Sequence, residues 1–151
     1  MLTHDGRHKA ELWLRKIQES PVTRDIVAGF ERRPSLERVR IAVLDTGYDP
    51  DAIFFQTPDR RDRIRKWKDF AVSSSTLRRD MDGHGTHVLS LVMKVAPTAD
   101  FYVARVARDT GDLPASVDNV AKVRGRRRKP NSQHVVPLPA FLAHKSTDIC
   151  V

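Results

Sequence analysis

Residues 38–47 have the sequence RVRIAVLDTG. Four apolar residues, 41–44, are followed directly by Asp45 and then by the turn-forming pair Thr46 and Gly47. A short, unbroken apolar run that ends at a turn is typical of a strand buried on both faces, as in a parallel sheet. We therefore expect a buried strand here, with Asp45 at its carboxyl end.

The next regular segment begins at the sequence GHGTH, residues 83–87. Apolar residues recur from there at the spacing of an amphipathic helix, which predicts a helix from near His84 to a point before Pro97. The positions expected to face the core are Val88, Leu91, Val92 and Val95.

Two more elements follow along the chain. The sequence DFYVARVA, residues 100–107, predicts a second buried strand, and residues 115–123 predict the start of another helix. The order strand, helix, strand, helix implies right-handed crossovers and a parallel sheet. The predicted fold class is therefore α/β, a parallel sheet with flanking helices.

The segments before and between these elements have weaker patterns. Residues 8–18 carry apolar side chains at helical spacing among charges and predict a short amphipathic helix. Pro21 and Pro34 bracket what we expect to be a less regular link. Residues 49–82 are polar and interrupted by prolines, so they predict surface loops with a short strand at 66–71.

The composition is that of a globular protein of one domain, with 40% hydrophobic and 30% charged residues in 151. No apolar run is long enough to span a membrane. The N-terminus lacks the apolar segment of a secretory signal, and Cys150 is the one cysteine, so no intrachain disulfide can form. Both features favour a reducing, cytoplasmic location.

The net charge of +8 is concentrated near the C-terminus. Residues 124–151 hold six Lys or Arg and a single Asp, so the preceding 123 residues are close to balanced. We expect this basic, proline-containing tail to be disordered and solvated. Attraction to nucleic acid or an anionic membrane through charge alone is an alternative, without aromatic residues among the basic ones.

Asp45 and His84 together suggest a chemical site. The carboxyl edge of a parallel sheet is the usual place for sites in open α/β folds, and Asp45 is expected there. An Asp that accepts a hydrogen bond from one imidazole nitrogen fixes the tautomer and leaves the other nitrogen as a base. The glycines on both sides of His84 allow other groups to approach closely.

The sequences VRIAVLDTGYDP (39–50) and DGHGTHVLSLV (82–92) resemble the first two signature segments of the subtilases, the subtilisin-like serine peptidases. VAPTADFYVARV (95–106) is similar to the strand that follows in that family, and the resemblance covers about 37–123. It implies a subtilisin-like fold and serine endopeptidase chemistry, with peptide or protein substrates. It also implies that Asp45 is the orienting carboxylate, that His84 is the general base, and that His87 is structural.

The resemblance implies a nucleophilic serine after the histidine, in a Gly-Thr-Ser segment, and an oxyanion asparagine. Neither has a match, because Ser116, Ser132 and Ser146 lack that context. Asn119 and Asn131 also lie outside any matching segment. We therefore expect a truncated peptidase domain that is inactive alone, with 100–107 as the strand nearest the absent part. No cofactor is implied, although calcium binds many complete subtilases.

Several alternatives compete for the same residues. The sequence LDTG also occurs in aspartic peptidases, which require a mostly β fold that the helical segments here disfavour. His84 and His87, three apart on one helical face, could bind a metal, but no Cys or Glu accompanies them as in zinc helices. Asp80 and Asp82 are expected to be surface charges, with Asp80 as a possible orienting group for the loop.

Three regions result: an N-terminal helical extension and link (1–36), a partial subtilisin-like domain (37–123) and a basic tail (124–151). The leading hypothesis for function is an incomplete serine endopeptidase domain. The second is a non-catalytic binding or regulatory fragment, and the third is a nucleic-acid-interacting protein that binds through its tail. No metal and no specific nucleic-acid or membrane partner is expected.

Overall fold

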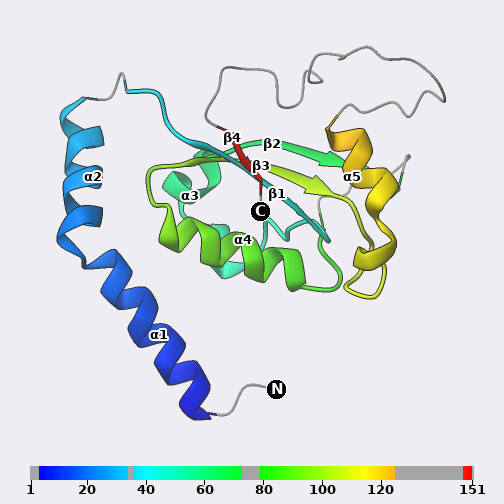
Figure 1. The fold of residues 1–151 in the computed structure, drawn as a ribbon, viewed down its shortest axis with the longest axis horizontal. Coiled ribbons are helices and arrows are strands. Elements are labelled where there is room, and N and C mark those ends of the chain that lie inside the picture. The colour runs from blue at the N-terminus through cyan, green and yellow to red at the C-terminus, as the bar shows by residue number, and fades with distance from the viewer. Residues whose placement is uncertain (1–3, 34–35, 73–78, 125–147, 151) are drawn as a thin grey trace.

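The computed structural model describes residues 4–33, 36–72, 79–124 and 148–150 (Figure 1). The α-helices are α1 (His4–Gln18), α2 (Pro21–Arg32), α3 (Pro58–Asp62), α4 (His84–Val95) and α5 (Val117–Val123). The strands are β1 (Arg40–Asp45), β2 (Ile64–Asp69), β3 (Asp100–Arg105) and β4 (Asp148–Cys150). Two short 3-10 helices are η1 (Ile53–Phe55) and η2 (Leu113–Ala115).

The strands form one parallel sheet in the order β2-β3-β1-β4. The register between β1 and β3 runs from Arg40 opposite Asp100 to Asp45 opposite Arg105. The predicted α/β class, with a parallel sheet and flanking helices, is confirmed. The expectation that β3 lies nearest an absent part is wrong, because β3 is paired on both sides, with β2 and β1.

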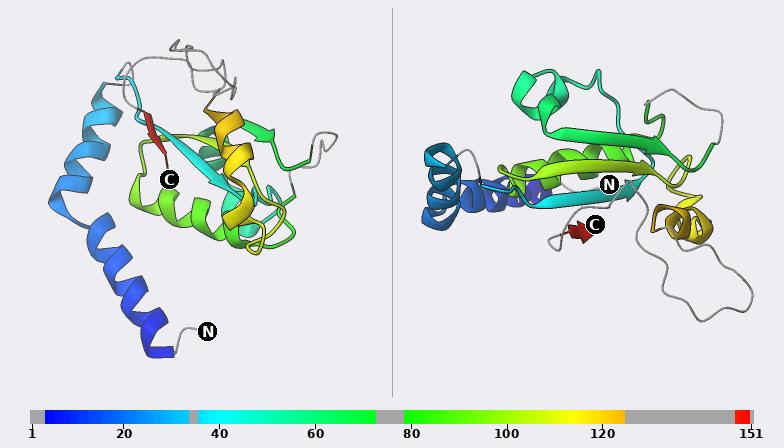
Figure 2. Two further views of the ribbon diagram at one scale, coloured as in Figure 1. Left: turned by 45° about the vertical axis from the view of Figure 1, so that its right-hand side comes forward. Right: turned by 90° about the horizontal axis from the view of Figure 1, so that it is seen from above.

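Two hydrophobic clusters cover opposite faces of this sheet. On one face, α4 packs Leu89 and Met93 against Val43 and Val103. On the other face, α5 packs Val123 against Ala104, the next residue along β3. Successive side chains of a strand point to opposite faces, so the two helices sandwich the sheet. Figure 2 shows this layered arrangement from two further directions.

The face of α4 that enters the core differs from the predicted one. The buried residues of α4 are Gly85, Leu89 and Met93, spaced four apart. Val88 and Val92 of the predicted stripe are only partly buried at the edge of the cluster, and Val95 is 42% exposed. The predicted helix is confirmed, but its core-facing stripe is rotated toward Leu89.

The segment between Pro21 and Pro34 is also more regular than expected, because residues 21–32 form α2. The Ser20 side chain accepts a hydrogen bond from the Thr23 backbone N–H at 3.2 Å, as an N-cap does. Pro21 occupies the first turn, where the missing N–H costs nothing. The predicted link is therefore an ordered helix, and Figure 1 shows α2 beside the body of the molecule, with α1 leading away from the sheet toward the N-terminus.

Residues 49–72 are more ordered than the predicted surface loops. The predicted strand at 66–71 is observed two residues earlier, as β2. Phe55 in η1 is only 1% exposed, and its ring contacts Tyr48 edge-to-face at 5.5 Å between centroids. Tyr48 and Phe55 therefore both belong to the hydrophobic cluster that contains Leu89 and Met93 of α4.

The C-terminal region combines ordered and undescribed residues. Arg124 follows α5 as its C-cap, and residues 148–150 form β4 beside residues 40–42 of β1. These positions depart from the expected disorder, while 125–147 lie outside the described residues. In the described part of the chain, no helix combines the length and the apolar character needed to cross a membrane.

Candidate active site

The site begins at the carboxyl end of β1. Asp45 is the last residue of the strand, and its side chain is 9% exposed. Its Oδ1 atom accepts a hydrogen bond from the Thr46 backbone N–H at 2.6 Å. Gly47 then turns the chain with φ of 107°, a left-handed conformation that favours glycine. The strand and the turn together hold the carboxylate at the edge of the sheet, as predicted.

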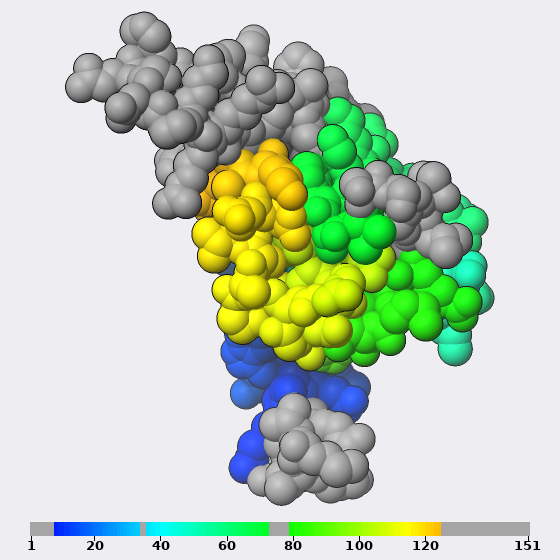
Figure 3. All heavy atoms as spheres, turned by 90° about the vertical axis from the view of Figure 1, so that its right-hand side faces the viewer, coloured from blue at the N-terminus to red at the C-terminus, as the bar shows by residue number. Residues whose placement is uncertain are grey.

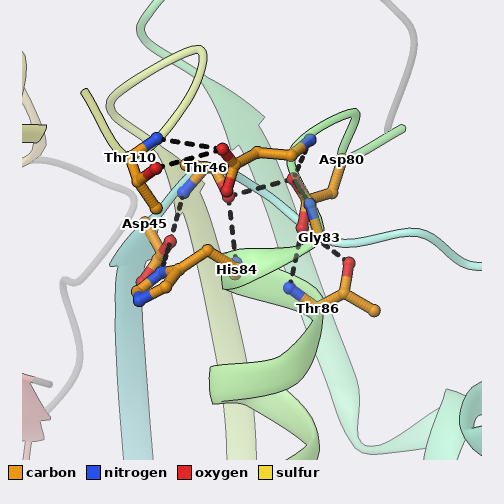
Figure 4. Close-up of polar contacts among 9 residues, drawn as sticks. Asp45, Thr46, Asp80, Gly83, His84, Thr86 and Thr110 are labelled. Atoms are coloured by element: carbon orange, nitrogen blue, oxygen red, sulfur yellow. Dashed lines mark hydrogen bonds and ion pairs between the residues drawn. The ribbon is translucent and has the colours of Figure 1, made fainter. Parts of the chain in front are cut away.

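His84 is the first residue of α4 and faces Asp45 (Figure 4). Its Nδ1 atom lies 2.8 Å from Asp45 Oδ1. An ionised carboxylate can only accept a hydrogen bond, so Nδ1 carries the proton and Nε2 of the neutral ring is free to accept one. The His84 side chain is 43% exposed, so the ring is accessible to solvent. The structure thus brings together the two residues that the sequence paired across 39 positions.

The surrounding charges favour the protonated form of the His84 ring. Its pKa lies above the ordinary 6.5, chiefly because of the hydrogen bond to Asp45. The negative charges of Asp45, Asp82 and Asp80 raise the pKa further, and partial desolvation opposes them. A carboxylate that stabilises an imidazolium strengthens the imidazole as a base.

Gly85 allows the start of α4 to lie directly on the turn after β1. A Cβ atom added at Gly85 would overlap the Gly47 carbonyl oxygen and would lie 2.9 Å from the Gly47 nitrogen. Any side chain at residue 85 therefore forces the helix away from the turn. The sequence predicted that the glycines beside His84 permit close approach of other groups. At Gly85 the group that approaches closely is the backbone of Gly47.

The N-terminus of α4 is capped from outside the helix. The N-cap residue is Gly83, with φ of 88°, and it has no side chain to accept the first free N–H groups. Thr46 Oγ1 instead accepts the Gly85 N–H at 2.9 Å, and Asp80 Oδ2 accepts the Thr86 N–H at 2.8 Å. The strand turn and the preceding loop thus supply the two acceptors.

Asp80 is a buried residue, not the surface charge expected from the sequence. It is 7% exposed, and its pKa is lowered by hydrogen bonds from Thr86, Gly83 and Thr46 although burial opposes that shift. The one partial signal was its place in the loop just before His84, where Asp80 was a possible orienting group for that loop.

Asp82 is exposed, as predicted. Its Oδ2 atom accepts hydrogen bonds from the backbone N–H and the hydroxyl of Thr110, both at 3.2 Å. These contacts join the loop before α4 to the loop after β3. Figure 3 shows the two segments side by side, the first in green and the second in yellow.

His87 does not take the structural role that the resemblance implied. Its side chain is exposed on α4, so it does not pack behind the site. Its backbone N–H donates to the Gly83 carbonyl as an ordinary helical hydrogen bond of 3.0 Å. Within the described ranges, no group of three or more His, Cys, Asp or Glu side chains could hold a metal ion.

The serine and asparagine candidates after α4 make local contacts. The Ser116 hydroxyl donates to the Leu113 carbonyl at 2.8 Å, and the Asn119 amide donates to the Val106 carbonyl at 2.8 Å. Both groups therefore serve the packing of α5 and its approach. Ser132, Ser146 and Asn131 lie outside the described residues.

The chain is similar to the "Subtilisin-like protease het-Q2" of Podospora anserina, with 27% identity over an alignment of 139 positions. The alignment covers 72% of this chain and 38% of that protein. No protein-family model matches the chain, and no solved structure does. The present chain is thus partly subtilase-like, a distant relative that spans well under half of the matched protein's length.

Proposed function

We propose that this chain supplies the Asp–His half of a subtilisin-like serine endopeptidase site. The observation that carries the proposal is the 2.8 Å contact between His84 Nδ1 and Asp45 Oδ1, with the ring accessible at the carboxyl edge of a parallel sheet. The similarity to a subtilisin-like protease supports the same reaction class. The substrates would be peptides or proteins.

In this proposal His84 acts as the general base. Nε2 takes the proton of a serine hydroxyl as the hydroxyl oxygen attacks the peptide carbonyl. The same nitrogen then returns the proton to the leaving amine, and an acyl-enzyme remains for hydrolysis by water. Asp45 holds the ring in the Nδ1–H tautomer and stabilises the imidazolium that forms, consistent with the raised pKa of His84.

The nucleophile and the oxyanion donor have no counterpart in the present sequence. No serine in it follows Gly-Thr, and Ser116 and Asn119 already donate to backbone carbonyls. The complete reaction therefore requires a serine-bearing segment beyond these 151 residues. The activity belongs to the assembled site and not to Asp45 and His84 alone.

A second candidate function is a non-catalytic binding or regulatory role. It is favoured by the same observation on Ser116 and Asn119, since a fold that keeps the Asp–His pair without a nucleophile can still bind a peptide or a partner. This role predicts binding that survives His84→Ala, because no proton transfer is involved.

Sequencing the transcript across codons 118–130 separates the two functions. A reading frame that continues into a Gly-Thr-Ser segment supports the peptidase. The encoded product should then react stoichiometrically with a fluorophosphonate probe and should lose that reaction in His84→Ala. A transcript that encodes only the present sequence overturns the peptidase proposal and supports the binding role.

A further inference from the structure

Beyond the pair itself, the carboxylate of Asp80 connects the two elements that carry Asp45 and His84. Oδ1 accepts from Thr46 Oγ1 at 2.9 Å, on the β1 side. Oδ2 accepts from the backbone N–H of Thr86 at 2.8 Å and from its hydroxyl at 2.7 Å, on the α4 side. Figure 4 shows the Asp80 side chain between these partners.

We propose that Asp80 is a positioning residue that sets the hydrogen bond between His84 and Asp45 by holding the turn after β1 against the N-terminus of α4. The proposal deepens the proposed function and rests on it for its catalytic meaning. The effect on the pair, however, is a property of the folded chain and can be measured without turnover.

Thr46 connects Asp80 to both Asp45 and the start of α4 through three hydrogen bonds. Thr46 is fully buried, and its Oγ1 accepts from the Gly85 N–H at 2.9 Å while donating to Asp80. The backbone N–H of the same residue donates to Asp45 Oδ1 at 2.6 Å. Thr46 therefore touches the catalytic carboxylate through its backbone and the helix start through its side chain, and Asp80 fixes the orientation of that side chain.

Thr86 makes a second connection of the same kind. Its hydroxyl donates to Asp80 and accepts from the Asp49 backbone N–H at 3.0 Å. Asp49 lies beyond Gly47, so the turn is held to the helix at two points. Both points depend on a side chain that donates its hydroxyl proton to the one carboxylate of Asp80.

An amide at residue 80 cannot replace this carboxylate. Oδ1 also accepts the backbone N–H groups of Asp82 at 3.2 Å and Gly83 at 3.0 Å, so the carboxylate accepts from five donors in all. In Asp80→Asn, whichever oxygen becomes an NH₂ group faces two or three donors. The variant keeps the shape of the side chain and loses part of the connection.

Asp82→Asn is a matched control for charge. Asp82 and Asp80 both act on the His84 ring by Coulomb attraction, together with Asp45, and the effect of Asp82 is the larger of the two. Asp82 is exposed, and its side-chain carboxylate accepts hydrogen bonds from Thr110, away from the turn after β1. A pure charge effect therefore predicts that Asp82→Asn lowers the pKa of His84 at least as much as Asp80→Asn.

The experiment is an NMR titration of His84 in the full chain, with the downfield Nδ1 proton as a second readout. We expect Asp80→Asn to lower the pKa of His84 toward the value found in Asp45→Asn, by more than Asp82→Asn does, and to abolish the downfield resonance. Asp82→Asn should lower the pKa only slightly and keep the resonance. Equal pKa values in Asp80→Asn and Asp82→Asn, or a retained resonance in Asp80→Asn, overturn the proposal.

Thr46 provides a test that does not depend on the folding of Asp80→Asn. Thr46→Val removes the hydroxyl without changing the shape, and Thr46→Ser restores it. We expect loss of the downfield resonance in Thr46→Val and its recovery in Thr46→Ser. A resonance that persists in Thr46→Val overturns the proposal. Failure of peptidase activity alone, with these NMR results intact, counts against the proposed function and not against this inference.

Discussion

The chemistry proposed for the site depends on a single hydrogen bond, from His84 Nδ1 to Asp45 Oδ1. Imidazole is the side chain whose ordinary pKa lies nearest neutrality, and the carboxylate of Asp45 at 2.8 Å raises the pKa of the His84 ring above 6.5. Removing the charge of that carboxylate should therefore change both the titration of the ring and the pH dependence of folding.

We predict that Asp45→Asn lowers the pKa of His84. The sign for stability follows from linkage: a group whose pKa is raised on folding stabilises the fold fully below its unfolded pKa, near 6.5, and that contribution is lost as pH rises through the folded pKa. The native chain should therefore have a higher free energy of unfolding than Asp45→Asn, and this difference should be larger below pH 6.5 than above the raised pKa of His84. Urea unfolding on both sides of this window measures it, and a pH-independent difference would contradict the linkage.

Gly85 permits a prediction with an internal control. Alanine in a helix interior is ordinarily more stable than glycine by about 1 kcal/mol. Gly29→Ala should show this gain, because the new Cβ in α2 has no atom within 4 Å apart from its own chain neighbours and helix backbone. Gly85→Ala should instead destabilise the fold and displace His84, because its Cβ meets the Gly47 backbone. Thermal unfolding of the two variants tests the contrast, and stabilisation by both would show that the contact yields.

The burial of Asp80 is a property of a single residue that the sequence did not predict. Charged residues are mostly exposed, so an Asp in a polar loop is read as a surface charge. Its burial depends on Thr46, which lies 34 positions away. The pairing of Asp45 with His84 was predictable because each residue lies at the end of a strongly patterned element, whereas the partners of Asp80 belong to a turn and a helix terminus.

At the scale of elements, the sequence predicted which segments are helices or strands better than it predicted their orientation. The sequence predicted a link after Pro21, whereas a proline in the first turn after the cap Ser20 begins a helix. In α4 the apolar residues outnumber those that the core accommodates, so periodicity alone left two neighbouring stripes open. Packing against Val43 and Val103 selects the stripe with Leu89.

We predict that Leu89→Ala costs about 2–5 kcal/mol in the free energy of unfolding, since Leu89 is fully buried beneath the sheet. Val95→Ala, on the stripe predicted from the sequence, should change it by less than about 0.5 kcal/mol because Val95 is 42% exposed. Denaturant unfolding of both variants measures the difference. Similar losses in the two variants would favour the predicted stripe over the observed one.

For the molecule as a whole, the sequence patterns did not predict the order of the strands in the sheet. Local patterns identify strands, but the neighbours of β3 depend on how the chain crosses over the sheet. With β2 on one side and β1 on the other, Val103 and Val106 are 0% and 1% exposed. The segment 100–107, which was expected to lie nearest an absent part, is therefore fully packed at these two valines. The sheet also places Asp45 and Arg105 side by side at its carboxyl edge.

We predict that this chain alone does not hydrolyse peptides. In subtilisin, removal of the nucleophilic serine alone lowers kcat by about 2 × 10⁶, which corresponds to roughly 8.6 kcal/mol of transition-state stabilisation. Loss of one oxyanion donor costs about 2.7–4 kcal/mol there, and the two losses are not additive. In this chain His84, oriented by Asp45, is a base that has no serine to activate, and its side chain is 43% exposed to water.

The purified chain should therefore give no adduct with a fluorophosphonate probe and no casein hydrolysis that responds to His84→Ala. A stoichiometric adduct on Ser116, Ser132 or Ser146 would place the nucleophile within this chain and would make the Asp–His pair part of a complete active site.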